Sequence, residues 1–161
     1  MTRIRAIIVD DEPLARRGLE LRLRAFDDFE IVAHCANGRE AIDAVAEHAP
    51  DLMFLDIEMP GIDGFEVLRR LPQTSMPMVV FVTAFDRYAI EAFDAHALDY
   101  LLKPLVDERL ERTMVHVREQ FAQRRSMQHR ERLVALLATV TGAGQLDADE
   151  LIARGAAGIP Q

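Results

Sequence analysis

Short apolar runs alternate with stretches of helical periodicity over the first two thirds of this chain. Five runs have strand length and are rich in valine, isoleucine, leucine and phenylalanine. Alternating strands and helices favour βαβ units and a mostly parallel sheet. The expected strands cover residues 4–9, 29–34, 51–55, 78–82 and 98–102.

The stretches between these strands predict helices over residues 13–26, 37–47, 63–71 and 86–94, and a long helix from about residue 105. Three strands are continuous apolar runs, which is typical of burial on both faces, whereas the second alternates and is expected near an edge. We predict an α/β fold: a doubly wound five-stranded parallel sheet, flavodoxin-like, with strand order 2-1-3-4-5 and an extended C-terminal helix.

Length and composition exclude several classes of protein. The 161 residues suit one domain, or one domain with an extension, and half of them are apolar. No apolar run approaches the roughly 18 residues of a membrane span, and the N-terminus lacks the apolar region of a signal peptide. We therefore expect a cytoplasmic protein without a membrane partner. The lone Cys35 excludes an internal disulfide and is expected to be a small buried hydrophobe.

The net charge of −8 is concentrated in the first part of the chain. Residues 1–105 carry 11 basic and 19 acidic side chains, and the rest of the chain is balanced. Such a surface is poor for nucleic acid and better suited to a divalent cation.

Polar residues follow the buried strands. Asp10 and Asp11 follow the first strand, Asp56 the third, Thr83 the fourth and Lys103 the fifth. Ligands of doubly wound sheets bind at this edge. Crowded carboxylates raise one another's pKa and destabilise a fold, and Mg²⁺ with its oxygen ligands removes that conflict.

Lys103 is the chain's only lysine, among 19 basic residues. A carboxylate such as Asp56 can act as a nucleophile toward phosphorus, and the transferring phosphoryl group needs positive charge on its oxygens. Lysine supplies a compact charge on a flexible stem, whereas the planar fork of arginine is bulkier. We interpret Lys103 as a residue kept for that point charge.

Four motifs carry a resemblance to a known family: IIVDDEPLAR, DLMFLDIEMPGIDGFEVL, VVFVTAFDRYAIEAF and ALDYLLKP. Over about residues 3–120 the chain resembles the receiver domain of two-component response regulators. The resemblance implies that Asp56 accepts the phosphoryl group and that Asp10, Asp11, Asp56 and the backbone carbonyl of Glu58 hold Mg²⁺.

The same resemblance implies further roles at the strand ends. Thr83 and Lys103 would contact the phosphoryl group, and the Lys103–Pro104 bond would be cis. Tyr100 matches the aromatic switch residue that turns inward when Thr83 moves.

The stretch TAFDRYAIEAFDAHALDYLLKP is similar to receivers of the LytTR (LytR/AlgR) transcription regulators. Those regulators carry a β-rich DNA-binding domain after the receiver, and residues 141–161 contain no such domain. Either this is a receiver from a longer protein, which we expect, or the gene product is short. We predict a receiver domain over residues 1–120 and a helical linker or extension over residues 121–161.

Structural interpretations stand beside the functional ones. Asp10 and Asp11 could cap the first helix, and Asp63 is interpreted as a cap and turn residue rather than a ligand. Thr83 could be an ordinary strand residue and Tyr100 a core aromatic residue. Tyr88 and Phe93 are interpreted as packing residues. The histidines do not have the spacing of metal ligands and are interpreted as structural or surface residues: His34, His48, His96, His116 and His129.

Two apolar stripes are expected on the long C-terminal helix. The first is Leu110, Met114, Val117 and Phe121, which should dock largely on the sheet. Residues 118–132 are expected to be a solvated helix or linker. The second stripe is Leu133, Leu136, Leu137 and Val140, which could pair two chains as a homodimer or pack on the absent domain.

We expect a phosphorylation switch rather than an enzyme. A sensor histidine kinase would phosphorylate Asp56 and shift a two-state equilibrium toward a dimer or output state, with transcription as the output and DNA bound only by a domain absent here. The alternative is a Mg²⁺-dependent phosphatase with Asp56 as nucleophile and Glu58 in the place of its second acid. An FMN-binding flavodoxin is set aside because DDEPLARR would repel a phosphate.

Overall fold

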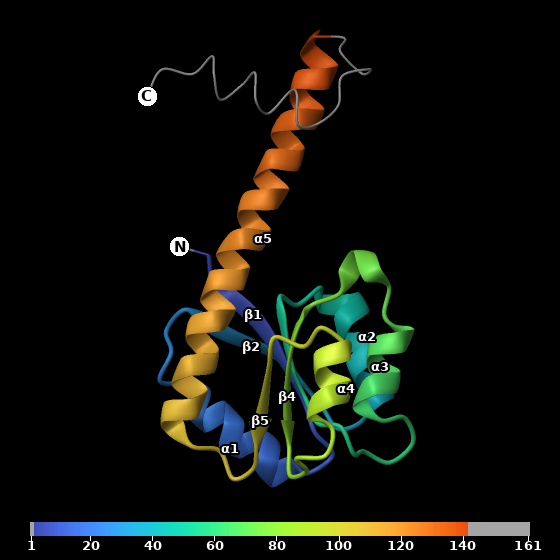
Figure 1. The fold of residues 1–161 in the computed structure, drawn as a ribbon, viewed down its shortest axis with the longest axis vertical. Helices are drawn as coiled ribbons and strands as arrows, with labels where there is room; N and C mark the ends of the chain where they lie inside the picture. Colours follow the sequence, from blue (N-terminus) through green and yellow to red (C-terminus); the bar gives the residue numbers. More distant parts are fainter. Residues whose placement is uncertain (1, 142–161) are drawn as a thin grey trace. The chain divides into compact units, whose positions relative to one another are not determined.

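Five parallel strands form one sheet in the computed structural model, which describes residues 2–141 (Figure 1). The strands are β1 (Ile4–Val9), β2 (Phe29–Cys35), β3 (Leu52–Leu55), β4 (Met78–Thr83) and β5 (Asp99–Leu102). The helices are α1 (Pro13–Leu23), α2 (Gly38–His48), α3 (Gly64–Arg70), α4 (Ala89–Asp94) and α5 (Asp107–Thr141), with a 3₁₀ turn η1 (Gln73–Ser75). The order β2-β1-β3-β4-β5 confirms the predicted doubly wound, flavodoxin-like fold and the edge position of β2.

Helices cover both faces of the sheet. In Figure 1, α1 and the start of α5 lie on one face, and α2, α3 and α4 lie on the other. Alternate residues of the central strands, such as Val9, Leu55 and Phe81, belong to the core on the α2–α4 side. Their neighbours face α1 and α5, whose buried apolar residues are Leu19, Leu23, Leu110, Met114 and Val117. The first apolar stripe of the long helix is thus buried through Val117, as predicted.

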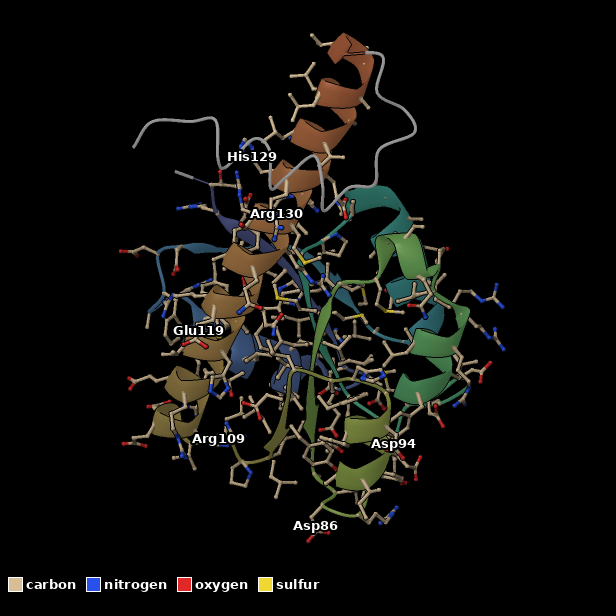
Figure 2. The ribbon with its side chains drawn as sticks, turned by 45° about the horizontal axis from the view of Figure 1, so that its top comes forward. Asp86, Asp94, Arg109, Glu119, His129 and Arg130 are labelled. Carbon is tan, nitrogen blue, oxygen red and sulfur yellow. The ribbon has the colours of Figure 1, made fainter. Side chains whose placement is uncertain are left out.

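The fourth helix is shorter than its periodicity predicts. It begins at Ala89 rather than at residue 86 and has six residues, of which only Ala92 is buried. Figure 2 shows Asp86 in the preceding loop and Asp94 at the end of the helix, and both are exposed. The prediction that Phe93 packs is wrong, because its side chain is 81% exposed. The backbone before Ala89 is held by side chains from other elements instead of by a helical turn.

The chain divides into two units, Met1–Arg118 and Glu119–Gln161. In the second unit, α5 continues to Thr141 with mostly exposed side chains, which confirms the prediction of a solvated helix. Leu136 and Val140 of the second stripe are 59% and 74% exposed. Within residues 2–141, none of the helices has the length and apolarity needed to cross a membrane.

Candidate functional site at the carboxyl edge of the sheet

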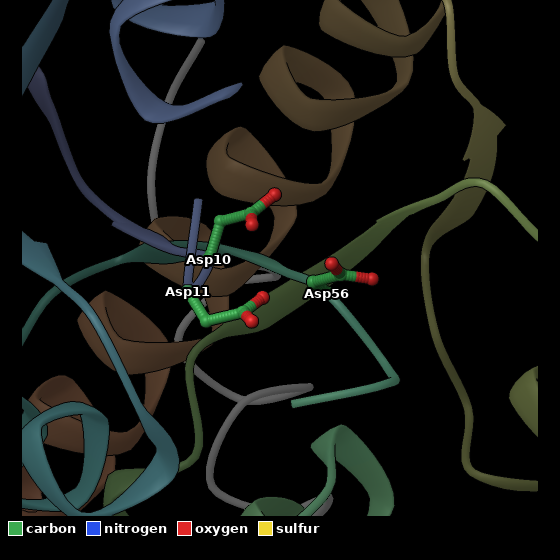
Figure 3. A group of neighbouring side chains, drawn as sticks. All are labelled: Asp10, Asp11 and Asp56. Atoms are coloured by element: carbon green, nitrogen blue, oxygen red, sulfur yellow. The ribbon is translucent and has the colours of Figure 1, made fainter. Parts of the chain in front are cut away.

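Three aspartates meet where β1 and β3 end. These strands pair in parallel with Val9 beside Leu55, so the residues that follow them emerge side by side. Figure 3 shows Asp10, Asp11 and Asp56 gathered at this point, and one carboxylate oxygen of each lies within 4.8 Å of the others. Asp10 and Asp56 are buried, at 4% and 6% exposure, and Asp11 is more open to solvent.

Lys103 is the cation of this cluster. Its Nζ lies 2.6 Å from Asp10 Oδ2 and 3.3 Å from Asp56 Oδ2, and its backbone N–H donates to the Thr83 carbonyl at 2.8 Å. The Lys103–Pro104 bond is cis, as the resemblance implies. Burial opposes the charged form of Lys103, but hydrogen bonding to Asp10 and attraction to Asp56 leave its pKa raised. One ammonium group is therefore shared between two buried carboxylates.

Asp56 is left short of positive charge. Burial raises the pKa of its carboxyl, the charge of Asp10 raises it further, and Lys103 and the N–H of Ile57 oppose both effects only in part. That N–H donates to Asp56 Oδ1 at 2.7 Å. Lys103, the nearest basic residue to Asp56, lies closer to Asp10 than to Asp56.

The cluster fits Mg²⁺. Asp10, Asp11 and Asp56 offer carboxylate oxygens, which are the hard donors this ion prefers, and Asp11 is the most exposed of the three. Three carboxylates and one ammonium group also leave two uncompensated negative charges when all are ionised. Glu58, the expected source of a backbone carbonyl ligand, lies two residues after Asp56 in the loop between β3 and α3.

That loop is packed tightly against Asp56. A Cβ on Gly64 would lie 2.5 Å from the Asp56 carbonyl oxygen, so glycine is needed there, and the Gly64 N–H donates to the Ile57 carbonyl at 2.9 Å. Asp63 accepts from the backbone N–H of Glu66 at 2.8 Å, which confirms that Asp63 caps α3. The Asp63–Gly64 pair therefore fixes the path of the chain beyond Asp56.

The capping interpretation of Asp10 is correct only in part. Asp10 Oδ1 accepts from the backbone N–H of Glu12 at 2.9 Å, while its other oxygen faces Lys103. The N-cap residue of α1 is Glu12, without a side-chain capping bond. Asp10 therefore supports the turn before α1 and the charge cluster at once.

Thr83 and Tyr100 lie along β4 and β5 beside the cluster. Thr83 is fully buried, and its Oγ1 accepts from the backbone N–H of Phe85 at 3.4 Å. Tyr100 is half-buried, with its ring centroid 6.4 Å from that of Phe81, and its hydroxyl donates to the Phe85 carbonyl. Both residues therefore hold the same point of the loop after β4, the backbone of Phe85.

Sequence reasoning missed two groups of side chains near this edge. Glu58 accepts hydrogen bonds from Arg87, to which the sequence analysis gave no role, and from Tyr88, which it interpreted only as a packing residue. Asp99 is bound by Arg109 and Thr113 of α5. The spacing of Arg109 and Thr113 puts them on one helix face, which is the only signal the sequence carries for this second group.

Comparison with known proteins decides the family. Residues 6–115 match the family model described as the response regulator receiver domain. The chain belongs to this family. The match begins in β1 and ends in α5, so it includes every strand and all the side chains of the aspartate cluster.

Curated relatives and solved structures agree with this assignment. Over 117 residues the chain is 53% identical to the transcriptional regulatory protein BtsR of Salmonella typhi, a match that covers 73% of this chain and 49% of that protein. The chain thus spans about half the length of such relatives. The crystal structure of the response regulatory domain of protein mrkE from Klebsiella pneumoniae is similar, with a TM-score of 0.69 and 32% identity over 74% of this chain and 98% of that one. The receiver domain of AraT from Geobacillus stearothermophilus gives a TM-score of 0.68 and 30% identity over 75% of this chain and 97% of that one.

Proposed function

We propose that this receiver accepts a phosphoryl group on Asp56 from the phosphohistidine of a sensor kinase. An Asp56 carboxylate oxygen forms a bond to phosphorus, the P–N bond breaks, and the histidine leaves as imidazole with the electron pair of that bond. The observation that carries the proposal is a buried carboxylate with a raised pKa that shares one ammonium group with a second buried carboxylate.

The neighbouring residues have distinct roles in this reaction. Mg²⁺ bound by Asp10, Asp11, Asp56 and the Glu58 carbonyl would neutralise the cluster and stabilise charge on the phosphoryl oxygens. Lys103 reaches from Asp10 and Asp56 to a phosphoryl oxygen, for which its single flexible charge is suited. Thr83 offers a hydroxyl at the same edge.

Phosphorylation then biases two arrangements of the loop after β4. In the structure, Tyr100 donates to the Phe85 carbonyl, and Thr83 accepts from the Phe85 N–H. If Thr83 turns toward a phosphoryl oxygen, Phe85 loses one of these partners and Tyr100 can turn inward. A modification at Asp56 thus shifts the population of a pre-existing state.

The output we propose is transcription, through a LytTR DNA-binding domain outside this chain, with a homodimer as the active state in the cytoplasm. The name of the BtsR relatives as transcriptional regulatory proteins supports this output, and those proteins are about twice as long as the match. The exposed second stripe of α5 supports a homodimer. DNA contact is not assigned to the residues of this chain.

We propose a signalling role rather than catalysis of a substrate's turnover. The phosphatase alternative needs Glu58 as a free general acid, but the Glu58 carboxylate accepts from Arg87 at 2.6 Å and from Tyr88 at 2.7 Å. Both donors come to the same oxygen, Oε1, so this carboxylate is engaged by the loop after β4 and is not free to face a substrate. This observation favours the receiver interpretation of Asp56.

The test is the intact mass of the protein after incubation with acetyl phosphate and Mg²⁺. The wild type is compared with Asp56→Asn, with Lys103→Arg and with an EDTA control. We expect a single phosphoryl adduct that requires Asp56 and Mg²⁺. Loss of the adduct in Lys103→Arg would support a phosphorylation role for the lysine, whereas its persistence would make Lys103 a switch residue. A folded wild type that stays unmodified, by acetyl phosphate and by phosphorylated sensor kinases alike, would overturn the proposal.

A further inference from the structure

The loop between β4 and α4, residues 84–88, is held by both tyrosines of the chain. The Tyr100 hydroxyl donates to the carbonyl of Phe85 within this loop. The Tyr88 hydroxyl, at the end of the loop, donates to Oε1 of Glu58 at 2.7 Å. One tyrosine therefore fixes the loop to β5, and the other fixes it to the loop that follows the phosphoacceptor.

Glu58 binds this loop through two donors. Its Oε1 also accepts from Arg87 Nη2 at 2.6 Å, and the same nitrogen lies 3.1 Å from the Tyr88 hydroxyl oxygen. The Arg87 guanidinium stands 4.5 Å from the ring centroid of Phe85 and 4.9 Å from that of Tyr88, in cation–π geometry. We call Glu58, Arg87 and Tyr88 the Glu58 tether.

Helix α4 has few other attachments. It is six residues long, its N-cap residue is Tyr88 without a side-chain capping bond, and it buries only Ala92. Ile90 and Phe93 are 78% and 81% exposed. A short helix with one buried residue is readily displaced, so the tether at its N-cap residue has a large influence on its position.

Glu58 also lies close to Asp56, in the loop that follows it. A single residue, Ile57, separates them along the chain; it is buried, and its backbone N–H donates to the Asp56 carboxylate at 2.7 Å. Gly64, from the far end of the same loop, packs on the Asp56 carbonyl. Both ends of the loop are therefore packed against Asp56, so we expect a displacement of Asp56 to move the loop.

We propose that the Glu58 tether couples Asp56 to α4 by a route separate from Thr83 and Tyr100. A change at Asp56 displaces Glu58, and Glu58 displaces the start of α4 through Arg87 and Tyr88. Glu58 is a positioning residue in this role, because its side chain acts on α4 and not on the phosphoryl group. The physiological signal it transmits rests on the proposed phosphorylation of Asp56.

The tether itself is tested without phosphate or divalent cation. Hydrogen–deuterium exchange is measured by mass spectrometry on the peptide that contains α4, in the wild type, Glu58→Gln and Tyr88→Phe. The matched control is Glu66→Gln. Glu66, like Glu58, accepts from two side chains, in this case Arg69 and Arg70, but it lies on α3. We expect α4 exchange to rise about fivefold in the two tether variants and to stay unchanged in the control. Equal exchange in all four proteins would overturn the tether.

The coupling is tested by a double-mutant cycle that also needs no phosphorylation. Asp56→Asn is introduced into the wild type and into Glu58→Gln, and the change in α4 exchange is compared. We expect Asp56→Asn to alter α4 exchange at least twice as much when Glu58 is present. Identical changes in both backgrounds, or no change in the wild type, would overturn the coupling.

A phosphorylated sample links the coupling to the proposed function. Acetyl phosphate and Mg²⁺ are added, and the α4 response is compared at equal adduct levels by intact mass. We expect the response to fall by half or more in Glu58→Gln and to be kept in Glu66→Gln; an undiminished response would contradict the tether as the route of the signal. If no protein gains an adduct from acetyl phosphate or from phosphorylated sensor kinases, the proposed function fails, while the double-mutant cycle still decides the coupling.

Discussion

Asp56 and Asp99 are both acids with largely buried side chains beside a basic residue, yet their surroundings differ. Their side chains are 8% and 12% exposed. Asp99 accepts from both terminal nitrogens of Arg109, at 2.5 and 2.8 Å, and from Thr113 Oγ1 at 2.7 Å. Asp56 has one N–H bond and a lysine that lies closer to Asp10. The negative charge of Asp99 is therefore fully compensated, whereas that of Asp56 is not.

The pKa directions follow from this difference. Burial raises the pKa of Asp99, but the hydrogen bonds from Arg109 and Thr113 outweigh it and leave the pKa lowered. Burial and Asp10 leave the pKa of Asp56 raised. The Asp99 cluster therefore stabilises the fold and attaches α5 to β5, whereas the Asp56 cluster lowers stability and keeps a carboxylate available for reaction.

The choice of base matches these two roles. Arginine presents a planar fork that binds both oxygens of one carboxylate, as Arg109 does for Asp99. Lys103 presents one charge that two acids share and that can move to a third oxygen. In a chain with a single lysine, that lysine lies between Asp10 and Asp56, the acid on which we propose phosphorylation.

Removal of Asp99 should produce the largest loss of stability. In Asp99→Ala, Arg109 and Thr113 lose their acceptor, and we expect a cost of about 2–3 kcal/mol. This is less than for a fully buried pair, because the Arg109 side chain is 36% exposed. Urea unfolding measures the effect. Asp28→Ala is the control, because the exposed Asp28–Arg118 pair should be worth less than about 1 kcal/mol. Equal losses of stability in both variants would mean that the Asp99 cluster is worth no more than an exposed ion pair.

Exchange of the base should weaken the same cluster by a smaller amount. Arg109→Lys keeps the charge but loses the two-pronged contact with Asp99, and we expect a cost of about 1–2 kcal/mol by urea unfolding. Arg22→Lys, at the exposed Arg22–Asp107 pair, should cost less than about 0.5 kcal/mol. An unchanged stability of Arg109→Lys would mean that charge alone, and not the fork, holds Asp99.

The Asp56 cluster could be predicted from the sequence, whereas the contacts of Asp99 could not. Strand order and the residues at the strand ends were predictable, because apolar runs define the strands and a parallel sheet brings their carboxyl ends together. This reasoning placed Asp10, Asp56 and Lys103 in one cluster. The contacts of Asp99 and Glu58 depend on the rotation of α5 and on the path of a loop, and neither has a periodic signal. The sequence predicted a helix from residue 86 with Phe93 packed, but α4 begins at Ala89 and buries only Ala92.

Neutralisation of Asp56 should change stability in the opposite sense to that of Asp99. Without divalent cation, Asp56→Asn removes a buried charge that is only partly compensated, while Lys103 keeps Asp10. We expect the variant to be more stable than the wild type by on the order of 1 kcal/mol at pH 7. Thermal unfolding in EDTA measures this difference. Added Mg²⁺ should stabilise the wild type more than the variant, and a variant less stable than the wild type in EDTA would show that Asp56 is compensated after all.

As the pH falls, Asp56 and Asp99 should cease to affect the free energy of unfolding at different pH values. A lowered pKa gives stability that is complete above the ordinary value of about 4 and is lost as the pH falls through the folded-state pKa, so the cost of Asp99→Asn should persist to acidic pH. A raised pKa gives a penalty that is complete above the folded-state pKa and disappears below about 4, so the gain from Asp56→Asn should begin to shrink at higher pH.

The measurement is the free energy of unfolding in EDTA from pH 7 to pH 3 for the wild type, Asp56→Asn and Asp99→Asn. The expected pattern is a gain for the Asp56 variant that fades first and a loss for the Asp99 variant that fades last. Two differences that fade over the same pH range would mean that the acids have the same degree of compensation. Lys103 shared between two carboxylates would then be as good a partner as the fork of Arg109, which the distances of 2.6 and 3.3 Å argue against.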